Sequence, residues 1–531
     1  MRHALDNALT TQAAGAGMRG GRAGWVLTAL ALAAVLLATG GLAAPAGASV
    51  LPAGAAGPAR LTASPPPDPE SLAGTVDAFK AAASSGFTVQ EGKLSEFNIA
   101  AMYDAGLIPS CWAYNGSTPY LVYKLPDAPG QKAQNNLTDA QLVPEDVGLW
   151  ADYRLRPDEA LVFIGRTPPE CTYFSYRGYL AVRYFDELRT KDKRRRVFAS
   201  LGDTTSSVRI KTTGTPADPV TGKAMPGDVF DKTTVIITSA DKETAARVKA
   251  ALVQAGYSPR IMNDDIIPRD LVRIGLEARN DTFTFINRVA MIKDPAAESA
   301  YFGNPQGTVL RLTPKQETLP RDLVPYAVPT LLVRGTGNCN EFTLKPTLEE
   351  LRSAIVAKFS KYAHKELDSK VWIGEGYDAI QQGIDGLGEN RDTIYLRSGN
   401  FLLTKDPSDF AIVFGVNHAA FGKVLYSNFG AYSDKILAGI GAVTNDQLVG
   451  TADAYLPGNP LAKYFYVWAV ARQPVPGLNT LVVQPGKTAE TIAYDNRMFM
   501  GFRAYVEPST GVGPYYAEVL YDRVLKFGRT K

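Results

Sequence analysis

The most regular pattern of hydrophobic and polar positions lies between residues 231 and 315. Short β-branched runs alternate there with stretches whose apolar residues recur at helical spacing. Asp241 is placed to cap the first helix, and Asp294 with Pro295 is placed to begin the second. The pattern predicts strands at residues 233–238, 259–262, 281–292 and 309–312. The order β-α-β-β-α-β is that of a ferredoxin-like (split βαβ) module, which we expect at residues 231–315.

Residues 346–531 begin with two helical patterns and continue with short strands. Thr347 and Glu350 have the spacing of a capping box, and an apolar stripe follows them as far as Tyr362. A shorter amphipathic helix is expected at residues 375–387. Strand-like runs follow at residues 393–403, 410–421, 435–443, 464–472, 479–484, 497–506 and 518–527. The Gly, Pro and Asn turns between them indicate a β-rich sandwich or jelly-roll-like C-terminal domain after the helix pair.

Residues 71–230 form a mixed β region that is rich in aromatic side chains. Strand-like runs occur at residues 120–124, 160–164 and 171–183, and Pro168-Pro169 separates the last two. Together with the two regions described above, this pattern predicts the α+β fold class.

The N-terminus carries the features of a secretion signal. A basic segment ending at Arg22 precedes an apolar run, and Ala46-Gly47-Ala48 fits the small-x-small pattern that signal peptidase accepts. Gly40, Gly41 and Pro45 make the apolar run too short for a transmembrane anchor. We therefore expect a signal peptide at residues 1–48, a Pro/Gly/Ala-rich linker at residues 49–70, and a secreted, soluble protein without a stable membrane span.

Composition narrows the classes of partner. The chain has 45% hydrophobic and 21% charged residues, which is enough to build sizeable cores. A formal net charge of +3 gives no reason to expect nucleic acid as a partner. The densest basic cluster, Lys191 to Arg196, is interpreted as a solvated turn, with a phosphate or polyanion site as the alternative. The oligomeric state cannot be read from the sequence.

Cysteines and histidines are scarce. Export permits a disulfide bond among Cys111, Cys171 and Cys339, and the sequence leaves all three pairings open. His364 and His418 are the two histidines that remain after cleavage of the signal. Because transition-metal sites usually use two or three imidazoles, we expect no transition-metal site. No glycine-rich phosphate-binding motif occurs in a strand-to-helix context, so we expect no organic cofactor either. A calcium requirement is left open.

His418 is the first candidate for catalysis. It ends an apolar strand, where an imidazole is usually a satisfied core residue. In the functional alternative, His418 acts as a general acid or base, and Glu389 or Asp392, just before the neighbouring strand, orients it.

Aromatic residues supply a candidate binding surface. Tyr464, Tyr466 and Trp468 alternate along one predicted strand, which would align three rings on one face of a sheet. Such a row can stack against sugar rings. Packing into a core is the competing explanation of the same pattern.

Two short strings in the last third of the chain resemble a known family. Residues 390–395 (NRDTIY) and 502–508 (FRAYVEP) are similar to segments of a bacterial envelope family of unknown function with β-rich domains. The resemblance implies a β-rich organisation and no particular activity.

The sequence leaves two classes of function open. The first is a metal-independent extracellular hydrolase or lyase that acts on a carbohydrate-like substrate by acid/base chemistry. It is slightly favoured because the chain is long and contains several predicted domains. The alternative is a non-catalytic extracellular protein that binds carbohydrate or has a structural role at the cell surface. In both classes the expected ligand is a small molecule or a glycan.

Overall fold

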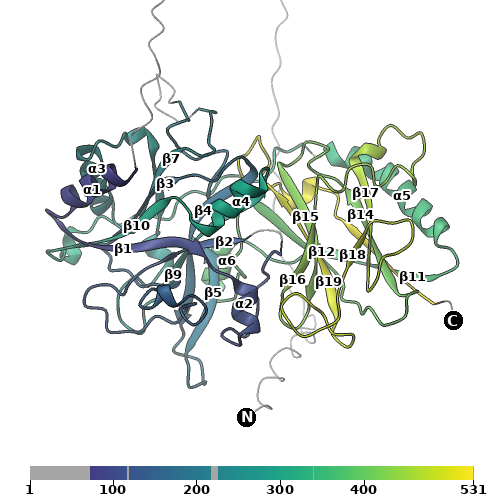
Figure 1. Cartoon of the computed structure of the whole chain (residues 1–531), viewed down its shortest axis with the longest axis horizontal. Coiled ribbons are helices and arrows are strands. Elements are labelled where there is room, and N and C mark those ends of the chain that lie inside the picture. Colours follow the sequence, from purple (N-terminus) through teal and green to yellow (C-terminus); the bar gives the residue numbers. More distant parts are fainter. Residues whose placement is uncertain (1–71, 117–118, 217–224, 339, 530–531) are drawn as a thin grey trace, which may run out of the picture. The chain divides into compact units, whose positions relative to one another are not determined.

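Ten strands between residues 87 and 314 form one large, curled sheet in the computed structural model (Figure 1). Their bounds are β1 Phe87–Glu96, β2 Tyr120–Lys124, β3 Ala160–Arg166, β4 Cys171–Tyr184, β5 Arg194–Ser200, β6 Thr205–Ser206, β7 Thr233–Ser239, β8 Met262–Ile266, β9 Thr282–Ile292 and β10 Gly307–Pro314. The order is β5-β4-β9-β2-β1-β10-β3-β7-β8, and β6 pairs with β4. Neighbouring strands are antiparallel except for β7 and β8, which are parallel.

The structure describes residues 72–116, 119–216, 225–338 and 340–529. The described residues all belong to one compact unit. The predicted signal peptide and linker lie outside the described residues. No helix in the described ranges is both long and apolar enough to cross a membrane.

The elements expected between residues 231 and 315 form, but they do not form a sheet of their own. Helix α3 (Lys242–Gln254) connects β7 to β8, and helix α4 (Pro295–Gly303) connects β9 to β10. Asp241 and Asp294 cap the two helices through their side chains. However, β9 pairs with β2 and β4, and β10 pairs with β1 and β3. The ferredoxin-like module is therefore not confirmed, because strands from residues 87–184 insert between its members.

Both faces of the large sheet are covered. Helix α1 (Leu72–Ala83) lies beside α3 over one face (Figure 1). Phe79 of α1 and Leu252 of α3 belong to one core cluster with Val162 of β3 and Ile237 of β7. Phe163, the neighbour of Val162, packs into a second cluster on the other face. Double coverage explains why β3 and β7 are almost continuously hydrophobic or β-branched instead of alternating.

Two further sheets of five strands each are built from residues 363–528. The strand bounds are β11 Ala363–Leu367, β12 Ser369–Val371, β13 Thr393–Ser398, β14 Phe410–Val416, β15 Tyr426–Ser433, β16 Gly439–Thr444, β17 Phe465–Ala471, β18 Thr480–Val482, β19 Met498–Tyr505 and β20 Arg523–Gly528. The first C-terminal sheet has the order β11-β20-β14-β17-β18. The second C-terminal sheet has the order β12-β13-β19-β15-β16.

The two C-terminal sheets share an apolar core. Val413 and Tyr466 of the first sheet belong to the same buried cluster as Phe429 and Phe502 of the second. Helix α5 (Lys345–Lys358) supplies Leu351 to a second cluster on the other side of the first sheet. The short helices α2 (Ile99–Asp104) and α6 (Gly376–Gln382) complete the helices. The protein is therefore mixed α+β and rich in sheet.

Helix α5 is shorter than its hydrophobic pattern predicts. It ends at Lys358, and residues 363–367 pair with β20 as strand β11 instead of continuing the helix. The predicted end at Tyr362 is wrong because the ring of Tyr362 packs edge-on against Phe410 of a neighbouring strand. Tertiary packing at the end of the apolar stripe thus overrides the helical spacing.

Lys124 anchors a buried ionic cluster at the end of β2. Its Nζ lies 2.6 Å from Asp139 and 2.6 Å from Asp146, and its side chain is 1% exposed. Lys93 reaches the same Asp146 from β1. Hydrogen bonds from the two lysines outweigh the effect of burial and lower the pKa of Asp146.

We expect Lys124→Met to lower the free energy of unfolding by about 3 kcal/mol, because it leaves the buried carboxylate of Asp139 without its cation and removes one of the two lysines that pair with Asp146. Lys80→Met is the matched control, since Lys80 pairs with an exposed Glu91 and should contribute about 0.5 kcal/mol or less. Urea denaturation followed by circular dichroism measures both. Equal effects of the two substitutions would show that the buried cluster adds no stability.

Candidate functional site

A cavity of about 510 Å³ lies where the large sheet meets the second C-terminal sheet. Strands β2, β4, β5 and β9 supply one part of the lining, and β13 and β19 supply another. Segments before β2, between β2 and β3, before β5 and before β13 complete it. This volume falls within the range of about 300–1,000 Å³ that small-molecule sites occupy.

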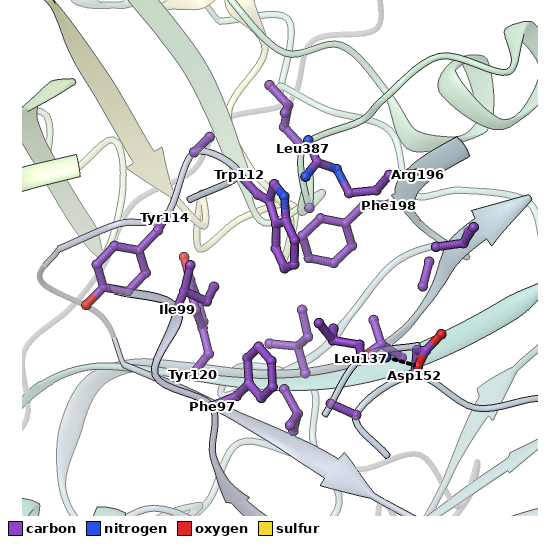
Figure 2. A pocket seen from close by; sticks show the side chains of 18 of the residues that line it. Phe97, Ile99, Trp112, Tyr114, Tyr120, Leu137, Asp152, Arg196, Phe198 and Leu387 are labelled. Carbon is purple, nitrogen blue, oxygen red and sulfur yellow. Dashed lines mark hydrogen bonds between the residues drawn. The ribbon is translucent and has the colours of Figure 1, made fainter. Parts of the chain in front are cut away.

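Aromatic and aliphatic side chains form most of the lining. Trp112 and Phe198 lie beside each other in an edge-to-face arrangement, with ring centroids 6.3 Å apart. Figure 2 shows Phe97 across the open space from these two rings, and Leu137 beside Asp152 at another side. Among the lining residues that the structure describes, none is a histidine or a cysteine. The lining therefore suits an apolar or aromatic molecule.

Unusual backbone conformations are concentrated around the cavity. Trp112, Ala113, Phe198 and Leu387 all line it, and their φ angles are 54°, 63°, 32° and 52°. These four are half of the eight non-glycine residues with positive φ in the described part of the chain. Such conformations cost about 1–3 kcal/mol each and persist where the surroundings fix them, often at ligand sites. Hydrogen bonds supply this constraint: the Ala113 N–H donates to Leu437, 2.9 Å away.

Arg288 on β9 brings a buried positive charge to the cavity. Its residue is 4% exposed. One terminal nitrogen donates to the hydroxyl of Tyr179, and the other donates to the carbonyl of Gly388 at 2.8 Å. The guanidinium lies over the ring of Tyr120, 5.4 Å from the centroid. These contacts hold the charge with neutral oxygens and ring faces.

Arg503 on β19 has a similar environment. It is 5% exposed, and its terminal nitrogens donate to the hydroxyl of Tyr432 and to the carbonyl of Ala113, the latter at 2.8 Å. Its guanidinium lies 5.5 Å from the ring centroid of Tyr395. Arg288 of the large sheet thus bonds to the segment that precedes β13, and Arg503 of the second C-terminal sheet bonds to the segment that precedes β2.

Neither guanidinium has an ion pair with a described carboxylate. Burial lowers the pKa of both arginines, but tyrosine neighbours outweigh burial and raise the pKa well above the usual value. Other buried arginines of the large sheet are paired: Arg177 lies 3.0 Å from Asp265, and Arg183 lies 2.7 Å from Asp281. The two cavity arginines are therefore charged groups held by uncharged partners.

Two aspartates and two further arginines also line the cavity. Burial raises the pKa of Asp152, whose carboxylate accepts the N–H groups of Asn136 and Leu137. Asp192 pairs with Arg194 at 3.2 Å. Arg196 pairs with Asp385 and lies over the ring of Trp112. Of the basic cluster at 191–196, Arg194 and Arg196 therefore line the cavity, whereas Lys191 and Arg195 are exposed.

His418 is buried in an ionic cluster away from this cavity. Its Nδ1 lies 2.8 Å from Glu341, and its Nε2 lies 3.7 Å from Asp522. Burial alone would lower the pKa of His418, but these carboxylates raise it to about 10. A histidine that stays protonated near neutral pH cannot serve as a general base there.

The structure does not bring Glu389 or Asp392 into contact with His418. Glu389 accepts hydrogen bonds from the N–H of Ser200 at 3.1 Å and from its hydroxyl at 3.0 Å. Asp392 accepts from Tyr173 at 2.8 Å and also from Thr204. The two carboxylates precede β13 in the second C-terminal sheet, whereas His418 follows β14 in the first. Neighbouring strands in the sequence are thus in different sheets.

Tyr464, Tyr466 and Trp468 do not form an exposed row of rings. Tyr464 ends a short 3₁₀ turn before β17, and its ring packs edge-on against Phe421. Tyr466 is 1% exposed and donates a hydrogen bond to Asp522 at 2.6 Å. Trp468 is half-buried against the core that the two C-terminal sheets share. Core packing explains the alternation of these three residues.

The cysteines give no catalytic site in the described residues. Cys111 and Cys171 are both buried and free, so these two thiols do not pair with each other. Burial raises the pKa of each thiol to about 12, which keeps both protonated. Cys339 lies outside the described residues.

Arg288 and Arg503 are the site residues that sequence reasoning missed. Each is the one charged residue of its strand, TFTFINRVAMI for β9 and MFMGFRAY for β19. A charged residue in the middle of a fully buried strand requires a partner. A lone arginine within a strand that is expected to be buried is therefore the sequence signal that could have identified Arg288 and Arg503.

Comparisons with known proteins leave the family undetermined. No protein-family model matches the chain, and no curated protein matches it. An uncharacterized protein from Burkholderia cenocepacia is 11% identical over 88% of this chain and 91% of its own, with a TM-score of 0.33. A protein from Vibrio parahaemolyticus is 9% identical over 86% of this chain and 99% of its own, also with a TM-score of 0.33. Likeness at this level carries no argument about function.

We expect the stabilisation from His418 to depend on pH. Because its folded pKa of about 10 exceeds its usual value of 6.5, the contribution is complete below pH 6.5 and is lost as the pH rises toward 10. His418→Gln should lower the free energy of unfolding by about 3 kcal/mol at pH 6, because Glu341 loses its cationic partner. Urea denaturation at pH 6, 8 and 10 measures the difference from the unmodified chain.

His364→Gln is the matched control, since His364 is exposed on β11 and should have little effect at any of these pH values. A His418→Gln deficit that is the same at pH 6 and pH 10 would contradict the charged pairing.

Proposed function

We propose that this chain is an exported protein that binds a small, largely apolar ligand in the cavity between the large sheet and the second C-terminal sheet. The observation that carries the proposal is the coincidence of two features: an aromatic-lined cavity of ligand size, and four strained residues in its lining. Strained residues cost stability, so their concentration around one cavity is better explained by function.

The location outside the cytoplasm rests on the sequence. The secretion signal expected at residues 1–48 supports export, and the linker expected at residues 49–70 separates it from the folded unit. We further infer that the two C-terminal sheets form a β-sandwich, which their shared core supports. In this arrangement, the sandwich would supply one wall of the binding cavity.

A metal-independent hydrolase or lyase is the second candidate, and Asp152 is the observation that favours it. Its buried carboxylate lines the cavity, and burial raises its pKa, as acid/base chemistry requires. Incubation with a panel of glycans and esters tests this candidate. A product that forms with the unmodified chain and disappears with Asp152→Asn would establish catalysis over binding alone.

Binding can be measured with N-phenyl-1-naphthylamine, a neutral apolar probe that fluoresces when it leaves water. We expect saturable fluorescence with the unmodified chain. Val122→Trp should weaken binding at least about tenfold, because Val122 lines the cavity and the indole would occupy its space.

Val371→Trp is the matched control, since Val371 is 44% exposed on β12 and lies outside the lining. Thermal denaturation checks that both variants fold. Absence of saturable binding to the unmodified chain, or equal affinities in the two folded variants, would contradict the proposed site.

A further inference from the structure

We propose that the ligand is an organic acid whose carboxylate binds at Arg288 and Arg503 while its apolar body lies along the aromatic lining. This inference rests on the proposed binding function and specifies the class of ligand. It also gives a role to two buried charges that the fold itself leaves without an ion-pair partner among the described residues.

The two arginines act on the same tyrosines. Tyr395 and Tyr505 both have Arg288 and Arg503 among their electrostatic neighbours. Tyr120 is a neighbour of both guanidinium groups and also lines the cavity. Both arginines line the cavity, with Arg288 over the ring of Tyr120 and Arg503 near the ring of Tyr395. From these contacts and the shared tyrosines we infer that a single anionic group can interact with both charges.

The tyrosines do not neutralise this charge. Burial raises the pKa of Tyr395 and Tyr505 above the usual value, so their hydroxyls stay protonated at neutral pH. A neutral hydroxyl can donate a further hydrogen bond to a bound carboxylate. The hydroxyls of Tyr395 and Tyr505 therefore favour a bound anion, as the two guanidinium groups do.

Unused hydrogen-bonding capacity points in the same direction. A guanidinium has five N–H donors, and the described bonds of Arg288 use two of them, to Tyr179 and to Gly388. The described bonds of Arg503 also use two. The flat, forked donor geometry of arginine matches a carboxylate, and such charge-assisted pairs are stronger than neutral hydrogen bonds.

The aspartates of the lining are engaged elsewhere. Asp192 pairs with Arg194, and Asp152 accepts two backbone N–H groups. The lining as a whole contains four arginines and two aspartates, so it has an excess of positive charge. The surrounding rings of Phe97, Trp112 and Phe198 exclude a purely inorganic anion as the best-fitting occupant, because it would leave these apolar surfaces unfilled.

The test compares 1-naphthylacetate with 1-naphthylacetamide, two ligands that share an apolar body and differ in charge. Isothermal titration calorimetry of the full chain at pH 7 should give an affinity about 10- to 100-fold higher for the acid. Arg288→Met and Arg503→Met should each reduce this preference severalfold or more while amide binding persists. Arg195→Met is the matched control, since Arg195 is exposed on β5 and lies outside the lining.

The outcomes separate this inference from the proposed function. If neither ligand nor N-phenyl-1-naphthylamine binds, the proposed function fails. If the probe binds but neither naphthyl ligand does, only the organic-acid inference fails. If the amide binds as tightly as the acid, or if the preference survives in both folded arginine variants, the cavity binds ligands but the organic-acid inference is wrong. Should an arginine variant fail to fold, the acid–amide comparison on the unmodified chain still decides. Inorganic phosphate alone should not compete at concentrations similar to that of the acid.

Discussion

Two guanidinium groups buried between the large sheet and the second C-terminal sheet are the constraint on which the arrangement of this protein depends. Taking a charge out of water costs several kcal/mol unless partners replace the lost solvation. Arg288 recovers part of that cost from Gly388, and Arg503 recovers part from Ala113. Arg288 of the large sheet therefore bonds to a segment that leads into the second C-terminal sheet, and Arg503 of that sheet bonds to a segment that leads into the large sheet. The same two charges thus connect both sheets and line the cavity.

The strained backbone follows from this arrangement. Ala113 supplies its carbonyl to Arg503 while its own φ is 63°, and Gly388 directly follows Leu387, whose φ is 52°. Loops that must present a carbonyl to a buried cation and still leave a cavity open have few conformations available. Stability is thereby given up for a preformed site, a trade that is common where function needs a fixed geometry.

Local structure was more predictable from the sequence than strand partners were. Helices α3 and α4 begin directly after their predicted capping residues, and both ends of β9 lie within one residue of the predicted bounds. These features were predictable because helix caps and hydrophobic periodicity depend on neighbouring residues only. Strand β15 (YSNFGAYS) was missed because serine, asparagine and glycine indicate turns, although every residue in it is buried. The partners of His418 were also missed, since Glu341 comes from a segment 77 residues away. Contacts of this kind depend on tertiary structure that spacing does not encode.

A crystal structure of the full chain with 1-naphthylacetate tests the central claim most directly. The account predicts electron density for the naphthyl ring among Trp112, Phe198 and Phe97, with carboxylate oxygens within hydrogen-bonding distance of Arg288 and Arg503. Density for the acid at another place, with the cavity occupied only by water, would contradict it.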